Sequence, residues 1–386
     1  MQPGDLITYD FRIQPSSHIP NSPTVLQFNI ERGYQLSNIL RLLLSHPSDI
    51  LCLQELDIQC ERTQHIDIVK YLAKELQMKA AFVVEFVEEY HEKRSKYHQG
   101  GGVHGNAILS KYDFDPRVIE HEHQPFDWVS NGLSYGEPRQ GGRYTIIGDF
   151  YFNDKTKLTV YSAHLEPFCG MIGRLLQFSE IARDVAHQKP SHPFVIAGDL
   201  NTLGHGLARF SPRYCNDRMR FYSFGWTESE FWLSNILCFQ LSTDDKNDER
   251  YATRKMANRS HFLLDPASYT YLMSLDVIET FDGMEESFKI KRWLNVYKAK
   301  LDWMLVHRMK PTLSLVLNND YSASDHKALF ARFERIDSSD DWEIMATKWR
   351  NSWAEHGRRK RLALFGSTVL ATFGLAFLAL RRLYLP

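Results

Sequence analysis

Apolar runs of strand length alternate with amphipathic stretches of helical spacing through residues 24–200. Continuous apolar runs predict buried strands, and apolar positions three and four residues apart predict helices. We expect helices over 36–44, 66–76 and 172–185. We expect strands over 25–30, 49–53, 81–87, 106–109, 144–152, 158–162, 194–197, 301–306 and 328–333. This mixture of hairpins and crossover helices favours an α/β fold in which two sheets pack face to face with helices outside.

The stretch from 202 to 300 breaks this alternation. Its periodicity is weak, and it is rich in aromatic residues, among them Phe210, Phe221, Phe224 and Trp226. A connection of this length carries structure of its own. Two interpretations stay open: a peripheral helical insertion with its own small core, or a lid that forms part of a substrate groove.

The C-terminus is the second exception, because residues 362–380 carry no charged side chain. As a helix rising 1.5 Å per residue they would extend about 28 Å, close to the ~30 Å hydrocarbon core of a bilayer. Four basic residues at 358–361 precede this segment and two at 381–382 follow it, so the positive-inside rule places the body of the protein in the cytosol. We therefore predict a single-pass transmembrane tail anchor at 362–380. A buried core helix is the alternative.

These patterns divide the chain into four parts. Residues 1–23 contain four prolines and little periodicity, which predicts a loose lead-in. Residues 24–335 form the predicted globular domain, residues 336–361 a basic juxtamembrane linker, and residues 362–380 the anchor.

Composition narrows the function. A chain of 386 residues with 43% hydrophobic and 24% charged residues has ample material for a core. The net charge is −1, and residues 336–386 carry eight Lys or Arg against five Asp or Glu, so the body is slightly acidic. That balance excludes a general polyanion binder, which shows a basic excess. The five cysteines include no CxxC pair and predict reduced thiols in a cytosol-facing protein.

Polar side chains stand at the ends of the predicted strands, where α/β enzymes place their chemistry. Each has an ordinary structural interpretation when taken alone, such as a turn residue or a buried ion-pair partner. Their recurrence in order along one α/β chain favours a phosphate-cleaving metal site. In chain order these residues are Asn29, Gln54, Glu55, His164, Asp199, Asn201, Asp302, Asp325 and His326.

The motifs that contain these residues resemble those of the endonuclease/exonuclease/phosphatase superfamily, which has the deoxyribonuclease-I-like fold. Two of these motifs are Gly198-Asp199-Leu200-Asn201 and Ser324-Asp325-His326. The resemblance covers residues 24–335 and is weakest over 201–301. It implies a four-layer α/β sandwich and a divalent cation, magnesium or in its place manganese. His164 is similar to a histidine of deoxyribonuclease I and the sphingomyelinases that the abasic-site endonucleases generally lack.

The resemblance also implies roles for the residues. Glu55 would be the main metal ligand, with Asp325 and Asn29 as further candidates. Asn29 and Asn201 would orient the phosphate, and Asn106 resembles a residue on a strand that borders the site.

Four further residues would carry the proton chemistry. Asp199 would position the attacking water. His326, paired with Asp302, would be a general base or a phosphate-stabilising cation. His164 would be an acid or an oxyanion stabiliser. Whether His326 or Asp199 takes the proton stays open.

Two substrates suit this chemistry. The first is a membrane phosphodiester, such as a phospholipid or sphingolipid headgroup, since a tail anchor would hold the site near one leaflet. The second is nucleic acid, cleaved by a nuclease or deadenylase tethered to an organelle membrane. The slightly acidic body weighs against the second, because nucleic-acid affinity rests mainly on Lys and Arg contacts to phosphates.

Overall fold

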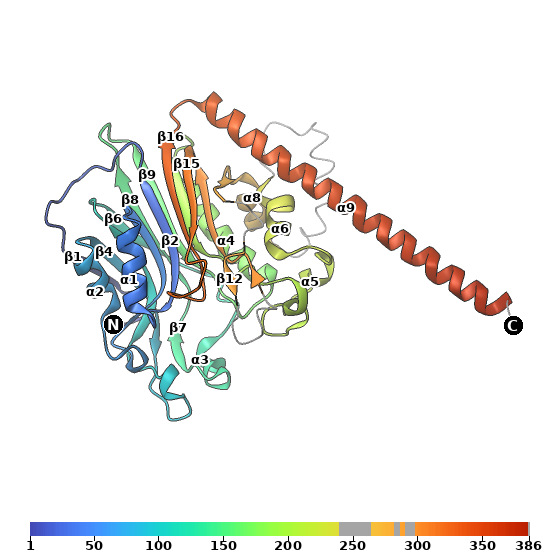
Figure 1. Ribbon diagram of the computed structural model, residues 1–386, viewed down its shortest axis with the longest axis horizontal. Coiled ribbons are helices and arrows are strands. Elements are labelled where there is room, and N and C mark those ends of the chain that lie inside the picture. Colours follow the sequence, from blue (N-terminus) through green and yellow to red (C-terminus); the bar gives the residue numbers. More distant parts are fainter. Residues whose placement is uncertain (239–263, 282–285, 290–297, 385–386) are drawn as a thin grey trace.

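Two mixed β-sheets packed face to face form the centre of the protein (Figure 1). This computed structural model describes residues 1–238, 264–281, 286–289 and 298–384, apart from the side chains of residue 207 and of residues 366–384. The first sheet contains, in spatial order, β1 (Leu6–Asp10), β4 (Lys79–Glu88), β5 (Val103–Ser110), β3 (Ile50–Ile58), β2 (Thr24–Arg32), β16 (Ala328–Arg335) and β15 (Met309–Leu317), with β7 (Arg139–Gly141) paired to β4. The second contains β11 (Ile278–Glu279), β14 (Asp302–His307), β10 (Phe194–Asp199), β9 (Lys157–His164), β8 (Tyr144–Tyr151) and β6 (Asp115–Glu120).

Helices cover the outer face of each sheet. Helices α1 (Leu36–Ser45) and α2 (Ile68–Glu75) share one apolar cluster with the first sheet. Helices α4 (Met171–Ala186), α6 (Glu228–Trp232) and α8 (Pro266–Ser274) share another with the second sheet. A third cluster fills the space between the sheets. The predicted α/β fold, two sheets flanked by helices, is confirmed.

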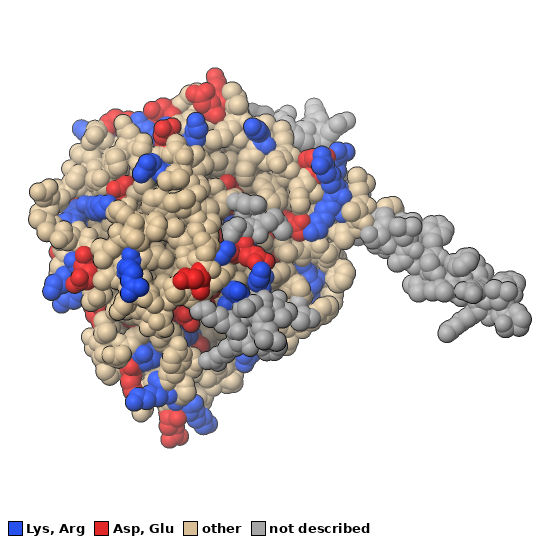
Figure 2. All heavy atoms as spheres, in the orientation of Figure 1, with Lys and Arg blue, Asp and Glu red and all other residues tan. Residues whose placement is uncertain are grey.

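Every strand and helix predicted from the sequence is present. The hydrophobic pattern did not predict some other strands. One is β15, whose residues are mostly exposed, and another is β1, which lies within the predicted lead-in 1–23 and pairs with β4. Acidic and basic side chains are interspersed on the face shown in Figure 2, as the near-neutral composition implies.

The described helical parts of the 202–300 insertion pack on the second sheet. They include η4 (Gly206–Phe210), α5 (Met219–Tyr222), α6, the π-helical turn η5 (Leu233–Leu237) and α8. The ribbon formed by β12 (Phe288–Lys289) and β13 (Lys298–Ala299) lies instead beside His326, to which Phe288 forms a β-bridge. Trp226, Phe231 and Trp232 are buried in the same apolar cluster as α4. Part of the predicted insertion lies outside the described residues, namely 239–263, 282–285 and 290–297.

Helix α9 (Ser339–Tyr384) begins against the body and then extends beyond it (Figure 1). Most of the segment predicted as a basic linker, 336–361, forms the first half of this helix. Trp342 and Ala346 are buried in the cluster between the sheets, and Leu364 packs against the cluster that contains Trp226.

Within the described residues, no helix meets the length and apolarity needed to cross a membrane. The side chains of 366–380, most of the predicted span 362–380, lie outside the described residues, so the tail anchor stays a prediction.

Candidate active site

Three adjacent strands of the second sheet bring His164, Asp199 and Asp302 side by side. The strand register pairs His164 at the end of β9 with Asp199 at the end of β10, and Asp199 with Asp302 at the start of β14. Directly paired residues point to the same face of a sheet. Gly198 permits the close approach of β10 to β9, because a Cβ atom there would lie 2.0 Å from the backbone oxygen of Ala163.

At the same end of the first sheet, β-bulges turn carboxylates toward this row. The register shifts once in each of the β2–β3, β3–β5 and β4–β5 pairs. Glu31, Glu55 and Glu85 fall in these shifts, and Glu31 and Glu55 adopt φ values of 47° and 58°. Left-handed backbone at a non-glycine residue costs on the order of 1–3 kcal/mol and clusters at functional sites. The bulges thus place acidic side chains where regular alternation would not.

Buried amides connect the two sheets beneath the site. The amide nitrogen of Gln27 donates to Oε1 of Gln54 at 2.9 Å and to Oδ1 of Asp302 at 2.7 Å. The amide nitrogen of Gln54 donates to Oγ of Ser162 at 2.9 Å. These bonds join side chains of β2 and β3 to side chains of β14 and β9, which fixes the two rows of polar residues relative to each other.

His326 lies between two carboxylates. Its Nδ1 is 2.8 Å from Oδ2 of Asp302, and its Nε2 is 3.7 Å from Oδ2 of Asp199. Burial opposes a charge on the imidazole, but Asp302 and Asp199 outweigh it and raise the pKa of His326 well above its usual range. Burial, together with Asp302, raises the pKa of Asp199 to about 7. In this pair, the imidazolium of His326 holds a proton, and the carboxyl group of Asp199, which titrates near neutrality, can accept one.

His164 is a neutral hydrogen-bond donor. A guanidinium nitrogen of Arg143 lies 3.0 Å from its Nδ1 and can only donate, so the ring proton sits on Nε2. Burial and the charge of Arg143 hold the pKa of His164 well below its usual range. Its Nε2 is 3.7 Å from Oδ2 of Asp199 and 3.9 Å from Oε1 of Glu55. Of the two predicted roles, this geometry suits the stabilisation of an oxyanion rather than proton donation.

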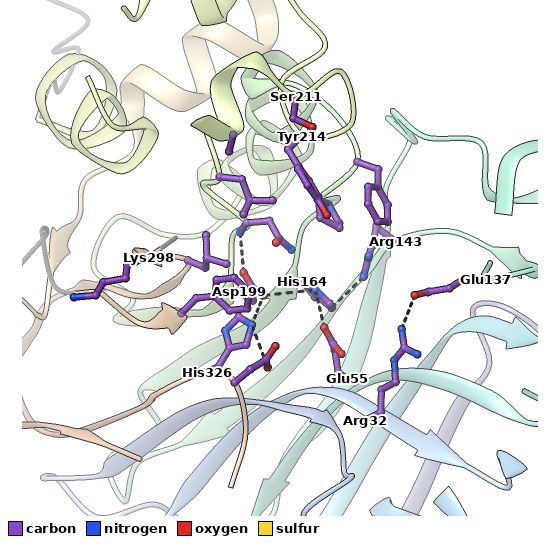
Figure 3. A pocket seen from close by; sticks show the side chains of 18 of the residues that line it. Arg32, Glu55, Glu137, Arg143, His164, Asp199, Ser211, Tyr214, Lys298 and His326 are labelled. Atoms are coloured by element: carbon purple, nitrogen blue, oxygen red, sulfur yellow. Dashed lines mark hydrogen bonds and ion pairs between the residues drawn. The ribbon is translucent and has the colours of Figure 1, made fainter. Parts of the chain in front are cut away.

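These groups form one side of a pocket of about 860 Å³ (Figure 3). Glu55, His164, Asp199 and His326 converge there, and Ser211 and Tyr214 lie on the opposite side. Much of the remaining wall is apolar or aromatic, formed by Trp128, Pro167, Phe168, Leu203, Ala208, Tyr214 and Phe288. The pocket therefore combines a charged floor with a wall on which apolar and aromatic side chains stand among charged ones such as Arg32, Arg139 and Lys298.

The sequence profile of the Endonuclease/Exonuclease/phosphatase family matches residues 26–326. This span covers most of the chain and contains all the site residues described above. The chain belongs to this family. It is therefore an enzyme, a hydrolase of the phosphodiesterase and phosphatase kind. The family generally depends on a divalent metal ion.

The chain is also similar to solved structures. ANGEL2, a 2′,3′-cyclic phosphatase, matches with a TM-score of 0.50 and 15% identity, over 82% of this chain and 96% of that one. An endonuclease/exonuclease/phosphatase from Beutenbergia cavernae matches with a TM-score of 0.46 and 14% identity, over 82% and 72% of the two chains. D. rerio TDP2 complexed with single strand DNA product matches with a TM-score of 0.45 and 14% identity, over 81% of this chain and 99% of that one. The curated proteins contain no significant match to this chain.

The carboxylates at the end of the first sheet fit the family's divalent cation. Glu31 accepts a hydrogen bond from the backbone nitrogen of Asp325 at 3.2 Å. Burial and the charges of Asp325 and Glu55 raise the pKa of Glu31 to about 7. Burial and the charge of Glu55 also raise the pKa of Asp325. Three mutually repelling carboxylates supply the hard oxygen donors that Mg²⁺ and similar ions prefer.

Within the described residues, the group whose potential ligand atoms all lie within 4.8 Å of one another is a different one, Asp199, Asp302 and His326. It fits a metal less well. Oδ2 of Asp302 is bonded to His326, and its Oδ1 is bonded to Gln27. The arrangement is that of an imidazolium and the carboxylate that orients it.

Asn29 holds two carboxylates together. Its amide nitrogen donates to Oε1 of Glu55 and to Oδ2 of Asp199, each at 3.1 Å, and its Oδ1 accepts from the backbone nitrogen of Glu31. With its oxygen used in this way, Asn29 positions Glu55 and Asp199. Its predicted roles in binding metal and phosphate stay predictions.

The other two predicted asparagines are placed differently. Asn201 lines the pocket, with φ of 50°, and its amide nitrogen donates to the carbonyl of Leu165 at 2.8 Å. Asn106 lies behind Glu55, whose backbone nitrogen donates to its Oδ1 at 3.4 Å, and it is not part of the pocket wall. Asn106 therefore supports the backbone of Glu55.

Sequence reasoning missed a second histidine–aspartate pair. His104 lines the pocket, and its Nδ1 is 2.8 Å from Oδ1 of Asp57. The signal was present, since Asp57 follows Glu55 by two residues, as Asn201 follows Asp199. Glu31 was also missed. Burial lowers the pKa of His104 although Asp57 opposes this, so His104 is a second neutral imidazole beside Glu55.

Proposed function

We propose that this enzyme is a Mg²⁺-dependent phosphodiesterase that acts on a phospholipid or sphingolipid headgroup while anchored to a membrane. The observation that carries the proposal is the composition of the pocket. Its floor holds the carboxylates and histidines that phosphodiester cleavage needs, and its wall presents Trp128, Phe168, Tyr214 and further apolar side chains. Apolar surface beside a phosphate-cleaving centre suits a substrate that joins a phosphodiester to an apolar body.

In this mechanism Glu55 would be the main metal ligand, with Asp325 and Glu31 beside it. Burial would raise the pKa of Glu55, but Arg32, Asn29 and the imidazolium of His326 outweigh it and lower that pKa, so Glu55 stays ionised. Mg²⁺, or Mn²⁺ in its place, would offset the charge of a phosphoryl oxygen and of the leaving group.

The remaining steps belong to the protein's own side chains. Asp199, with a pKa of about 7, accepts a proton from the attacking water. His326, held by Asp302, stays an imidazolium and donates from Nε2 to a phosphoryl oxygen. His164 donates from its own Nε2 to the same developing charge. The sequence left open whether Asp199 or His326 takes the proton, and the proposed mechanism assigns it to Asp199.

Membrane attachment is part of the proposal. Residues 362–380 carry no charge, four basic residues precede them, and α9 continues through this range. The catalytic domain would face the cytosol, because the larger basic cluster lies on its side of the span.

A nuclease or deadenylase at an organelle surface is the second candidate. What favours it is a group of arginines on the pocket wall, since guanidinium groups bind phosphates well. These arginines already have partners. Arg32 lies 2.9 Å from Glu137, and Arg143 lies 3.1 Å from Glu166. They offer less free positive charge to a polynucleotide than their number suggests.

A substrate panel separates the two candidates. The full chain, reconstituted in vesicles, is assayed with Mg²⁺ and with EDTA on sphingomyelin, lysophospholipids, single-stranded RNA, nicked DNA and a 2′,3′-cyclic phosphate. We expect Mg²⁺-dependent release of a phosphorylated headgroup, abolished in Asp199→Asn. Cleavage of nucleic acid far above that of lipid would favour the second candidate. Lipid cleavage insensitive both to EDTA and to Asp199→Asn would contradict the metal mechanism.

A further inference from the structure

Exposed phenylalanines are concentrated in one region of the protein. Within the described residues, only Phe210, Phe221, Phe224 and Phe365 are exposed, with 65–70% of their surface accessible. Three of them lie between residues 210 and 224, where Tyr222 is also 57% exposed. We call Phe210, Phe221, Tyr222 and Phe224 the aromatic surface. Scattered exposed apolar residues are ordinary, but a group of aromatic residues marks an interaction site.

This surface is held by a buried arginine. Arg209 donates to the backbone oxygen of Arg220 at 2.6 Å, to Oγ of Ser223 at 2.7 Å and to the backbone oxygen of Gly204 at 2.9 Å. It also bonds the backbone oxygen of Trp226. Ser223 and Trp226 are buried while their neighbours point outward. The exposed rings therefore stand on a loop whose backbone is fixed from within.

The surface adjoins the helix that carries the apolar C-terminal segment. A Cβ atom on Gly225 would lie 2.6 Å from Leu364, so the loop that ends the aromatic surface packs directly on α9. Figure 1 shows α6 beside α9, and Lys360 on α9 pairs with Glu230 on α6. Leu362 and Phe365 on the same helix are 63% and 70% exposed. The aromatic surface thus continues into the segment predicted to enter a membrane.

Basic side chains surround the same region. Arg358 and Arg359 on α9 have 67% and 77% of their side chains exposed. Arg213 and Arg218 are exposed on the chain leading into α5. Figure 2 shows Lys and Arg side chains gathered where α9 leaves the body. Aromatic rings bordered by cations suit the interface of a bilayer that contains anionic lipids.

We propose that the aromatic surface enters the headgroup region of an anionic bilayer and so turns the pocket toward the lipid. Arg209 connects the two features, because it bonds Gly204 at the pocket side and Ser223 on the aromatic loop. Ala208 and Ser211, which flank Phe210, line the pocket. The inference rests on the membrane attachment proposed above and not on the phosphodiesterase chemistry. Contact at this surface presents the wall formed by Phe168 and Tyr214 to the lipid.

Site-specific fluorescence tests this contact without catalysis. The native cysteines are all buried, so Phe221→Cys and Phe224→Cys in the full chain take an environment-sensitive dye at one position each. Leu44→Cys, which is 56% exposed on α1, is the matched control. The chains are reconstituted in phosphatidylcholine vesicles with a minority of phosphatidylserine. We expect a blue shift at 221 and 224 and quenching by spin-labelled lipids, and neither effect at 44.

If the chains float with the vesicles but the dye at 221 and 224 behaves as it does at 44, the aromatic contact is overturned and the proposed anchor is not. Chains that do not float would overturn both. A blue shift that forms without lipid would mean a protein partner or a second copy, and would also overturn the proposal.

The triple variant Phe221→Ser, Tyr222→Ser, Phe224→Ser tests the consequence for activity. Because it removes buried apolar contact with lipid, we expect hydrolysis of vesicle lipid to fall about tenfold. Hydrolysis of a water-soluble bis-aryl phosphate is expected to stay unchanged. Equal losses on both substrates would contradict the orienting role. If the unmodified protein shows no phosphodiesterase activity on any of these substrates, the proposed function is contradicted but the fluorescence result is not.

Discussion

The Nδ1 atom of His326 lies 2.8 Å from Oδ2 of Asp302, and the two residues come from different sheets. Asp302 begins β14 of the second sheet, and His326 precedes β16 of the first. Gln27 on β2 bonds the other oxygen of Asp302 at 2.7 Å. The imidazole is therefore fixed at the junction of the two sheets, where its Nε2 faces Asp199.

Replacing Asp302 with Asn tests this relationship. The substitution keeps the shape but removes the charge that raises the pKa of His326, so that pKa should fall toward its usual value. We expect kcat to fall about 10²–10³-fold, the range for loss of a positioned donor to a developing oxyanion. The imidazole pKa is followed by NMR, and Gln27→Glu serves as a comparison that changes the opposite partner of Asp302. A kcat within twofold of the unmodified enzyme would contradict the assignment.

His164 should act without titrating in the working range. Since Arg143 fixes its proton on Nε2, we expect His164→Ala to lower kcat about 10²–10³-fold, as the loss of an oxyanion donor does. The acid limb of the pH–rate profile should keep its position, because His164 is neutral throughout. Arg143→Met should have a smaller effect in the same direction, and Arg143→Lys should restore part of it. A basic limb that is present in the unmodified enzyme and absent in His164→Ala would mean that His164 is a general acid.

Glu31 should bind metal at the expense of stability in the metal-free protein. Its carboxylate repels Asp325 and Glu55, so Glu31→Gln should raise the melting temperature in EDTA. The same change removes an oxygen charge from the site and should weaken Mg²⁺ binding about 10–100-fold. Differential scanning calorimetry with and without Mg²⁺ checks both effects. Glu61→Gln, near the start of the turn that follows β3, is the control and should change neither.

The sequence could predict those site residues whose positions follow from the hydrophobic pattern of the strands. Asp199 and Asp302 end or begin apolar strands, so their positions follow from the hydrophobic pattern alone. Glu31 could not be assigned in this way. It reaches the site through a bulge with left-handed backbone, and a bulge depends on how two strands pair, which local sequence does not encode.

The same reasoning explains the fold elements that were missed. Strand β15 was missed because most of its residues are exposed, so it lacks the apolar run of a buried strand. The start of α9 was taken for a linker because of its charges. Several of those charges bind the insertion: Arg350 pairs with Asp276, and Lys360 pairs with Glu230. Long-range partners of this kind cannot be deduced from local composition.

Asp57 should make the domain sensitive to acid. Burial opposes its charge, but Arg62 and His104 outweigh burial and hold its pKa at about 2. A carboxyl group with a lowered folded-state pKa stabilises the fold above its unfolded value, about 3.9, and loses that contribution as pH falls toward 2. We expect about 2 kcal/mol of unfolding free energy to disappear between about pH 4 and pH 2.

Denaturant unfolding at a series of pH values measures this loss. In Asp57→Asn the protein is less stable at neutral pH by about 3–5 kcal/mol, because Arg62 loses a buried partner. Its stability should also fall less steeply in acid. Asp115→Asn, exposed at the start of β6, is the control. An unchanged acid slope in Asp57→Asn would contradict the prediction.

The first turns of α9 should be part of the folded domain. Trp342 is 2% exposed, its indole nitrogen donates to Oδ2 of Asp276 at 2.6 Å, and its ring meets that of His307 edge to face. Trp342→Ala should lower the free energy of unfolding by about 3–5 kcal/mol, as large-to-small changes at buried tryptophans do. Ile344→Ala, two residues along the same helix and 70% exposed, should change it by less than about 0.5 kcal/mol. Equal effects of the two substitutions would mean that α9 only tethers the domain. A large difference would mean that the helix carrying the apolar C-terminal segment is built into the catalytic domain, so that the domain is held at a fixed orientation to that segment.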